Sequence, residues 1–417
     1  MKTLARWFEI SGGKSDRFAS MEGLRGIAIL LVFLDHYYDI IWRDLPLHSP
    51  ALSALGKAML GAGGTGVALF FVLSGFLIYG AVRKPALDLR KFLVRRTQRI
   101  YPAFLAVLLI YLAMSPFLHL MHSNSDRYTS RLPDTPAGTA LYVLANIAFI
   151  PGIFPVKPIM NVAWSLSYEW FFYLILPIVI MGLGLCRWQR KTRCAFFLSG
   201  ALLFLIANIA FPAVFYFPGN PGRETHVEAI MFAAGILLYE LVETQRMAKW
   251  NPAVVDAAAW IFGAAAIAVG AASGIAKNAL TAPDARFAEI EAVLTASLFV
   301  GYFALVLAAL VPGTRTARVL SARPIRWLGN MSFSFYLIHG LPLHIFGILA
   351  GRLHAGSLSG MSLWIAFAAA LPFVFAGTAA TSAVLFLAVE KRLSLAPHKP
   401  SVKSDRSAPS KGLTAVA

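Results

Sequence analysis

The sequence predicts an all-α polytopic membrane protein with about ten transmembrane helices, and its composition is the first observation behind that fold class. Of the 417 residues, 58% are hydrophobic and only 14% are charged, and the mean hydropathy is +0.67. A soluble domain has about 25% charged residues. So much apolar sequence does not fit into one water-soluble core, and a lipid bilayer is its natural solvent.

The distribution of positive charge is the second observation. The chain carries 37 Lys and Arg residues against 20 Asp and Glu, which gives a formal net charge of +17. The basic residues lie between the long apolar runs, as they do in the cytoplasmic loops of membrane proteins. We therefore expect membrane lipid as the partner of this charge, and no nucleic acid.

Ten apolar runs of helix-spanning length are the third observation, since a helix of about 20 residues crosses a bilayer. We expect each run to form one span. The runs are Gly26–Trp42, Ala62–Val82, Ile100–Met121, Trp164–Leu185, Ala195–Phe217, His226–Val242, Ala253–Ser273, Ala292–Val311, Asn330–Ala350 and Leu363–Val389.

An eleventh apolar stretch, Leu141–Ile153, contains Asn146, and its roughly 13 residues suit a re-entrant or interfacial segment. With ten spans and both termini cytoplasmic, 28 of the 37 basic residues lie inside the cell. If Leu141–Ile153 crossed as well, 17 would lie inside and 20 outside. Only the first arrangement has the cytoplasmic excess of Lys and Arg that real topologies show.

The runs divide the chain into three parts. Residues 1–19 form a cytoplasmic lead-in that lacks the apolar core of a secretory signal. Residues 20–390 form the membrane domain, and residues 391–417 form a basic tail rich in Pro and Ser that is expected to be disordered. The two cysteines, Cys186 and Cys194, show no metal-ligand spacing, so no metal site is expected.

Arg25 and His36 are the first candidate functional pair. They are eleven residues apart, so their side chains share one face of the first span, about 16 Å apart along its axis. Arg25 then lies near the cytoplasmic surface and His36 near mid-membrane. An ionisable residue at that depth indicates a polar cavity, and histidine is the usual general base. A histidine hydrogen-bonded between helices is the alternative. Asp39, one turn on, shares the face of His36, whereas Asp35 points about 100° away.

Arg96 and Arg99 lie three residues apart in the basic segment RKPALDLRKFLVRRTQRIYP, on one helix face. Guanidinium groups suit bidentate binding of phosphate, and coenzyme A carries a diphosphate and a 3′-phosphate. Anchoring of the topology is the alternative, because it needs basic charge without a particular spacing.

Glu169 stands within the first two turns of an otherwise apolar span, NVAWSLSYEWFFYLILP. A buried carboxylate needs a partner, and orienting or charging a histidine is one task for it. A glutamate that reaches to the interface is the alternative. Ser74 offers a hydroxyl ligand within GGTGVALFFVLSGFLI, although close helix packing explains these small residues better.

Tyr336 and His339, in MSFSFYLIH, are three residues apart and share one face of the ninth span. His339 is a second ionisable group at membrane depth, which makes it a functional candidate. A purely structural role between helices is an equally good interpretation.

Five of these segments together resemble the acyltransferase-3 family of bacterial membrane O-acyltransferases. The resemblance covers the chain from about Phe18 to Glu390 and keeps the order of the family's motifs. Glu22 stands where the family more often has an aspartate. We expect a stand-alone member, without the family's appended extracytoplasmic esterase-like domain. The segments are MEGLRGIAILLVFLDHYY, with Arg25 and His36; GVALFFVLSGFLI; RRTQRIYP, with Arg96 and Arg99; WSLSYEWFFYLILP, with Glu169; and SFSFYLIH.

The resemblance implies a location and a reaction. The protein is expected in the inner (cytoplasmic) membrane of a bacterium, with an acyl-CoA donor, acetyl-CoA above all, on the cytoplasmic side. The acceptor is expected to be a hydroxyl of a sugar or glycan, such as lipopolysaccharide or exopolysaccharide, and no protein partner is required. The implied catalytic residues are His36 and Glu169, the implied donor-binding residues are Arg25, Arg96 and Arg99, and the secondary candidates are Asp35, Asp39, Ser74, Tyr336 and His339.

Two other functions fit the same sequence. A transmembrane carrier would pass acyl groups to a separate transferase and would need that second protein. A proton-coupled secondary transporter would also suit ten helices with buried His and Glu residues. Transporters usually show paired halves with interrupted helices, and the sequence shows no such repeat.

Overall fold

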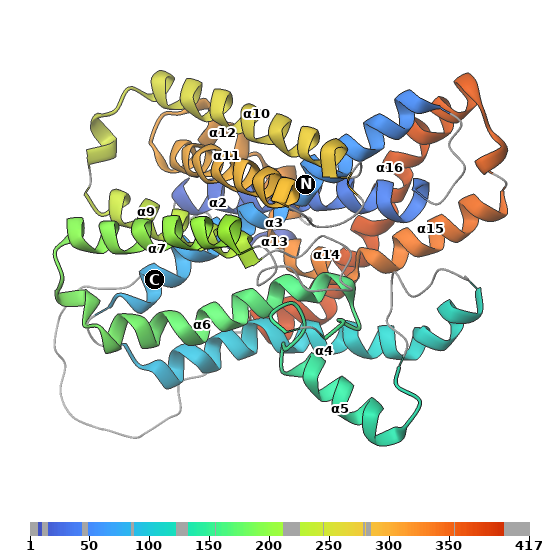
Figure 1. The fold of residues 1–417 in the computed structure, drawn as a ribbon, viewed down its shortest axis with the longest axis horizontal. Coiled ribbons are helices and arrows are strands. Elements are labelled where there is room, and N and C mark those ends of the chain that lie inside the picture. The colour runs from blue at the N-terminus through green and yellow to red at the C-terminus, as the bar shows by residue number, and fades with distance from the viewer. Residues whose placement is uncertain are drawn as a thin grey trace.

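The fold was analysed in a computed structural model of the chain (Figure 1). The structure describes residues 7–10, 16–43, 49–84, 87–121, 132–154, 156–211, 226–244, 246–277, 280, 285–353 and 355–395. Most of the predicted lead-in and residues 396–417 of the predicted tail lie outside the described residues. In the described part the chain forms helices and no β-strand.

Fourteen α-helices carry the labels of Figure 1, and short 3₁₀ or π-helical turns extend or connect several of them. The helices are α2 (Asp16–Tyr37), α3 (Pro50–Val82), α4 (Leu89–Met121), α5 (Pro136–Ile147), α6 (Trp164–Gly182), α7 (Arg190–Ala210), α9 (Ile230–Val242), α10 (Pro252–Lys277), α11 (Ala285–Leu310), α12 (Arg315–Leu320), α13 (Arg323–Asn330), α14 (Ser332–Ile338), α15 (Gly340–Arg352) and α16 (Gly360–Leu385). The π-helical turns are Tyr38–Trp42 after α2 and Phe386–Ser394 after α16, and the 3₁₀ turns are Asn161–Ala163, Leu185–Arg187, His226–Ala229, Arg246–Lys249 and Ala355–Ser357.

In the part of the chain that the structure describes, each of the ten predicted apolar runs overlaps a helix or successive helices, and residues 212–217 of the run Ala195–Phe217 lie outside that part. Within the described ranges, seven helices are long and apolar enough to cross a membrane, or eight if the bent pair α14 and α15 is one span. The other two predicted spans are α2, which carries charged residues near both ends, and α9, which has 13 residues. A polytopic helical membrane protein is thus confirmed, whereas ten crossings and cytoplasmic termini stay predictions.

The short helix α5 covers the first part of the segment that we predicted not to cross. It has 12 residues, about 18 Å of helix, against a hydrocarbon core about 30 Å thick. The chain turns after it at Phe149, whose φ is 56°, a left-handed conformation that side chains other than glycine rarely adopt. This length suits a re-entrant or interfacial segment.

Helix α3 lies in the interior of the bundle and packs against α2, α9 and α10 (Figure 1). Its glycines permit this, because their missing side chains let neighbouring backbones approach closely. A Cβ at Gly63 would lie 2.5 Å from the backbone of α2 at Leu31 and Asp35, and one at Gly75 would lie 2.2 Å from the Phe232 carbonyl on α9. The small-residue segment around Ser74 therefore does pack helices.

The bend between α14 and α15 is 45° and has a local cause. Pro342 lacks the N–H that would bond to the carbonyl of Ile338 in a continuous helix. Gly340 stands at the break with Tyr111 of α4 beside it, because a Cβ there would lie 2.5 Å from the Tyr111 hydroxyl. The bend places His339 at the junction of the two helices.

The topology can be tested through a native cysteine. Cys186 is exposed in the loop between α6 and α7, which the charge distribution places in the cytoplasm. In a Cys194→Ser variant, a membrane-impermeant maleimide should label Cys186 only after the cells are permeabilised. A Lys157→Cys variant of the cysteine-free protein should be labelled in intact cells, because this exposed position is predicted to lie outside. Labelling of Cys186 in intact cells would contradict the predicted orientation.

Candidate active site

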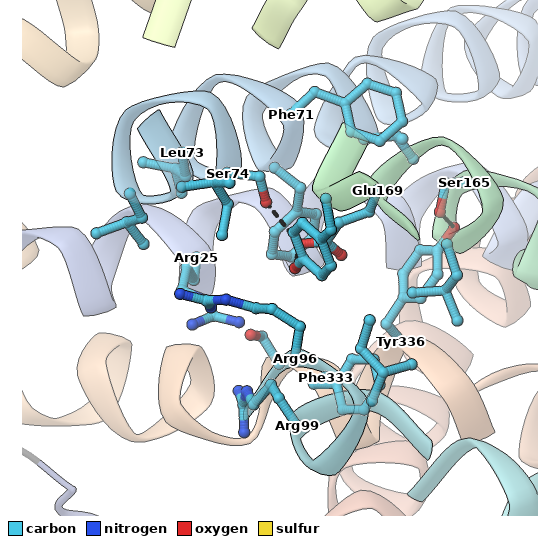
Figure 2. Close-up of a pocket in the computed structure, with 18 residues that line it drawn as sticks. Arg25, Phe71, Leu73, Ser74, Arg96, Arg99, Ser165, Glu169, Phe333 and Tyr336 are labelled. Carbon is cyan, nitrogen blue, oxygen red and sulfur yellow. Dashed lines mark hydrogen bonds between the residues drawn. The ribbon is translucent and has the colours of Figure 1, made fainter. Parts of the chain in front are cut away.

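A polar cavity lies among α2, α3, α4, α6 and α14 (Figure 2). Its volume is about 110 Å³, enough for several water molecules at roughly 10–15 Å³ each. Figure 2 shows the guanidinium groups at one side of the cavity and Ser165 with Tyr336 at the other. The candidate residues that line it are Arg25, Ser74, Arg96, Arg99, Glu169 and Tyr336.

Three arginines gather at one side of the cavity, from α2 and α4. Arg96 lies over the rings of Phe92 and Tyr173, at 5.4 and 5.5 Å from their centroids. The Nε atoms of Arg25 and Arg96 are buried and make no hydrogen bond to any residue that the structure describes. Buried donors of this kind usually have a hydrogen-bond partner. An anionic group or an ordered water molecule in the cavity would accept hydrogen bonds from these two Nε–H groups.

Arg99 is held by a carboxylate that the sequence analysis did not single out. Its Nη1 lies 2.7 Å from Oε1 of Glu390, and Glu390 is fully buried. The other oxygen, Oε2, accepts hydrogen bonds from the backbone N–H and the hydroxyl of Ser334, at 3.1 and 2.5 Å. Arg99 is thus oriented by a permanent partner, whereas Arg25 and Arg96 have donors left over.

Glu169 lines the cavity. Its Oε1 accepts a hydrogen bond of 2.7 Å from the Ser74 hydroxyl (Figure 2). The same oxygen accepts another from the Tyr173 hydroxyl. With Glu390 it supplies two carboxylates against three guanidinium groups. This leaves a formal excess of one positive charge in the cavity, which favours an anionic ligand.

His36 does not line this cavity, and the carboxylate beside it is Asp35. The Nδ1 atom of His36 lies 3.0 Å from the Val32 carbonyl oxygen and 3.1 Å from Oδ2 of Asp35. We expected Asp39 on this face, but it makes a 2.8 Å ion pair with Arg43 instead. Asp35 and His36 are adjacent in the sequence, and the flexible aspartate side chain bends back to its neighbour.

Tyr336 and His339 connect the cavity to His36. The Tyr336 hydroxyl lies 2.7 Å from the Ser165 hydroxyl and donates to the Val162 carbonyl at 2.8 Å. Its carbonyl accepts a 2.7 Å hydrogen bond from Nδ1 of His339. The ring of His339 in turn lies edge to face against that of His36, with centroids 4.7 Å apart. The arginine-lined cavity and the histidine pair are therefore neighbours separated by one layer of side chains.

Two residues of the site were missed, for different reasons. Glu390 is a charged residue at the end of an apolar run, a signal that was present, but its partner Arg99 is 291 residues away. Tyr173 gave no signal, because a tyrosine in an aromatic-rich span is ordinary. Among the described residues, no three His, Cys, Asp or Glu side chains could hold a metal ion together.

Comparison with known proteins identifies the family. A family model described as an acyltransferase domain matches residues 18–386. The chain belongs to the acyltransferase-3 family. This acyltransferase match covers the cavity, the histidine pair and most of the helices described above. No solved structure matches the chain.

The curated relatives of this acyltransferase include bacterial O-acetyltransferases. It is 24% identical to a peptidoglycan O-acetyltransferase of Listeria monocytogenes, over 77% of this chain and 48% of the relative. It is 26% identical to a putative peptidoglycan O-acetyltransferase of Bacillus subtilis, over 76% of this chain and 47% of the relative. A putative O-acetyltransferase of Staphylococcus aureus is 24% identical, over 76% of this chain and 49% of the relative. The chain thus spans about half the length of these relatives.

The arginines of the cavity should differ in what their loss does. Arg96→Ala should weaken acyl-CoA binding at an unchanged melting temperature, because Arg96 pairs with no carboxylate among the described residues, and its loss therefore leaves no buried charge unpaired. Arg99→Ala should lower both the affinity for acyl-CoA and the melting temperature, because it leaves the buried Glu390 without its counter-charge. Arg96→Lys should restore binding only in part, since an ammonium makes no bidentate contact.

Arg95→Ala is the matched control for these arginines, because Arg95 carries the same charge on the same helix but is exposed. It should leave donor binding and the melting temperature nearly unchanged. Binding by calorimetry and melting by intrinsic fluorescence would check this. Normal donor binding by well-folded Arg96→Ala and Arg99→Ala variants would reduce both arginines to anchors of the topology.

Proposed function

We propose that this protein is a membrane-bound O-acetyltransferase that moves an acetyl group from cytoplasmic acetyl-CoA to a hydroxyl of a glycan. The observation that carries the proposal is the arginine-lined cavity beside a histidine that is backed by a carboxylate. The cavity suits an anionic donor, and the histidine suits a base that removes a proton from a hydroxyl. The family and the names of the relatives support acyl transfer of this kind.

The donor would be held at the arginine side of the cavity. Arg25 and Arg96 have buried Nε donors without partners, and charge-assisted hydrogen bonds to phosphate would satisfy them. The pantetheine arm of coenzyme A would then extend toward His36, which lies about 16 Å from Arg25 along the helix axis. Glu169, held by Ser74 and Tyr173, would fix the cavity wall beside the arm.

His36 would act as the general base. Both groups at its Nδ1 accept hydrogen bonds, since one is the Val32 carbonyl and the other the Asp35 carboxylate. Nδ1 therefore carries the hydrogen, and Nε2 has the free lone pair. Asp35 would orient the ring and stabilise its charged form, as the aspartate does in catalytic triads.

The transfer would proceed in one displacement through a tetrahedral intermediate. Nε2 of His36 takes the proton of the acceptor hydroxyl while its oxygen attacks the thioester carbonyl carbon. The new C–O bond forms, the C–S bond breaks, and the proton passes from His36 to the leaving thiolate to give free coenzyme A. No cysteine is required as a nucleophile, and both cysteines lie in the loop and helix after α6, away from the residues of the cavity.

The acceptor is proposed from the relatives. Two of them are named as peptidoglycan O-acetyltransferases, so peptidoglycan is the first glycan to examine, ahead of lipopolysaccharide and exopolysaccharide. With such an acceptor, we expect the protein to act in the cytoplasmic membrane of a bacterium.

Mass spectrometry of cell-surface glycans, with and without the gene, tests this proposal. We expect one glycan fraction to lose an acetyl group per modified sugar when the gene is deleted, and to regain it when the gene is restored. Unchanged acylation in peptidoglycan, lipopolysaccharide and exopolysaccharide alike would contradict the proposal.

A further inference from the structure

The fully buried His339 has an unused nitrogen that faces no described hydrogen-bond donor. Its Nδ1 contacts the carbonyl oxygens of Tyr336 and Phe335, at 2.7 and 3.2 Å. Both are acceptors, so Nδ1 carries the hydrogen and Nε2 is a lone-pair acceptor. That Nε2 is buried and has no hydrogen-bond partner among the described residues. An orphaned buried acceptor costs about 1–3 kcal/mol, which calls for a functional or structural reason.

The partner that could satisfy this nitrogen is His36 in its charged form. While His36 is neutral, its Nε2 is also an acceptor, so the two Nε2 atoms have no hydrogen to share. Once His36 has taken a proton, its Nε2–H becomes a donor beside the ring of His339, whose centroid is 4.7 Å away. The contact therefore strengthens only when His36 becomes charged.

We propose that His339 is a positioning residue for acyl transfer, whose Nε2 accepts a hydrogen bond from the protonated His36, directly or through one bridging water. This inference rests on the proposed function. The interaction is absent before the acceptor hydroxyl gives up its proton and present afterwards. An interaction of this kind accelerates the reaction, because it stabilises the transition state more than the ground state. The proton itself still leaves with coenzyme A, and His339 returns to its orphaned state.

Two carbonyl groups of α14 orient the ring of His339, which stands at the bend between α14 and α15. Nδ1 of His339 donates to the carbonyl oxygens of Tyr336 and Phe335, and the Phe335 carbonyl also accepts the backbone N–H of His339. With Nδ1 engaged in this way, Nε2 is the nitrogen left to interact with a neighbouring side chain.

Other titratable and charged groups lie on the elements packed around the histidine pair, and they stay in place in the two His339 variants. The aspartates and the arginine belong to the same stretch of chain as His36, and the rest come from helices packed against it. The groups are Asp35, Asp39 and Arg43 on α2 and the turn after it, Lys57 on α3 next to the Gly56 that packs on Tyr38, Tyr336 on α14, His339 at the bend and His344 on α15.

The test measures acetyl transfer by the full chain in lipid nanodiscs, with radiolabelled acetyl-CoA and peptidoglycan fragments, over a range of pH. His339→Leu removes the acceptor, and His339→Gln keeps an amide oxygen that can accept. We expect His339→Leu to lower kcat roughly 10- to 100-fold, the worth of one hydrogen bond to a charged group, without changing KM for acetyl-CoA. His339→Gln should lose only a few-fold.

The pH profile separates positioning from structure. Without the hydrogen-bond acceptor on His339, the charged form of His36 is less favoured. His36 then remains neutral down to a lower pH. The acidic limb of kcat/KM should therefore move to lower pH in His339→Leu. His344→Gln is the matched control: His344 is a buried histidine whose Nδ1 also faces an own-helix carbonyl, that of Gly340. It should keep kcat and the profile of the wild type.

The outcomes distinguish this inference from the proposed function. A wild-type protein that transfers no acetyl group would overturn both. An active wild type with a His339→Leu variant of unchanged kcat would overturn the inference alone. A reduced kcat with an acidic limb that does not move, or that moves to higher pH, would also overturn the inference. A structural defect would leave the limb in place, and a charged His339 would move it to higher pH. Melting temperatures of all variants show whether each one is folded.

Discussion

Replacing His36 with glutamine should reduce acyl transfer by about 10²–10⁴-fold, the usual contribution of a general base, and in practice abolish detectable turnover. The amide of glutamine cannot take the proton from the acceptor hydroxyl. Binding of acyl-CoA should survive, because Arg25 lies about 16 Å away along the same helix and the other two arginines that would hold the donor lie on α4. The expected pattern is lost activity with retained donor affinity.

The variant should also fold. A neutral glutamine in place of a neutral histidine leaves no uncompensated charge at mid-membrane, and its amide N–H₂ can still donate toward Asp35. Single-turnover transfer, donor binding by calorimetry and the melting temperature would be measured on the same preparation. A folded His36→Gln protein with near-normal turnover would remove His36 from the mechanism, and His339 would become the first candidate for the base.

Replacing Glu240 with alanine should destabilise the protein by about 3–5 kcal/mol, the usual result of stranding one partner of a buried ion pair. Glu240 lies on α9 and is 1% exposed, and Arg193 on α7 makes two hydrogen bonds to it, at 2.7 and 2.8 Å. Tyr79 on α3 donates to the same carboxylate. Removing the carboxylate leaves a buried guanidinium group without its counter-charge. It also removes the hydrogen bonds that connect α3, α7 and α9.

Glu243→Ala is the control for this substitution, one turn further along the chain. Glu243 pairs with Arg83 at 2.7 Å, but the two side chains are 42% and 23% exposed, and exposed pairs contribute about 0–1 kcal/mol. Melting in detergent should therefore fall by several degrees for Glu240→Ala and hardly at all for Glu243→Ala. Equal melting temperatures for the two variants would show that the buried pair is not a stability element.

The fold was largely predictable because membrane helices can be recognised in a sequence as long apolar runs. Every run that the sequence indicated overlaps a helix among the described residues, and the short segment Leu141–Ile153 begins in a helix of only 12 residues. The bend before Pro342 and the π-helical turns that end α2 and extend α16 were not predicted. They depend on single hydrogen bonds and on packing, which hydropathy does not report.

Many members of the site were predictable, but Glu390, Tyr173 and most of the pairings were not. Helical spacing placed Arg25 and Arg96 on faces that turn out to line one cavity. Spacing could not show that Asp35 reaches His36 while Asp39 binds Arg43, because side-chain rotamers decide between neighbours on one helix. The Arg99–Glu390 pair could not be predicted either, since the two residues are 291 positions apart in the sequence.

The central claim is that this protein itself cleaves acetyl-CoA and transfers the acetyl group to a glycan hydroxyl. The most direct test is the release of free coenzyme A by purified wild-type protein in nanodiscs, supplied with acetyl-CoA and peptidoglycan fragments. We predict release that requires the fragments and that matches, one for one, the acetyl groups found on the glycan. No release, or transport of protons or acetyl-CoA without cleavage of the thioester, would contradict the claim, and release only after addition of a second protein would favour an acyl carrier instead.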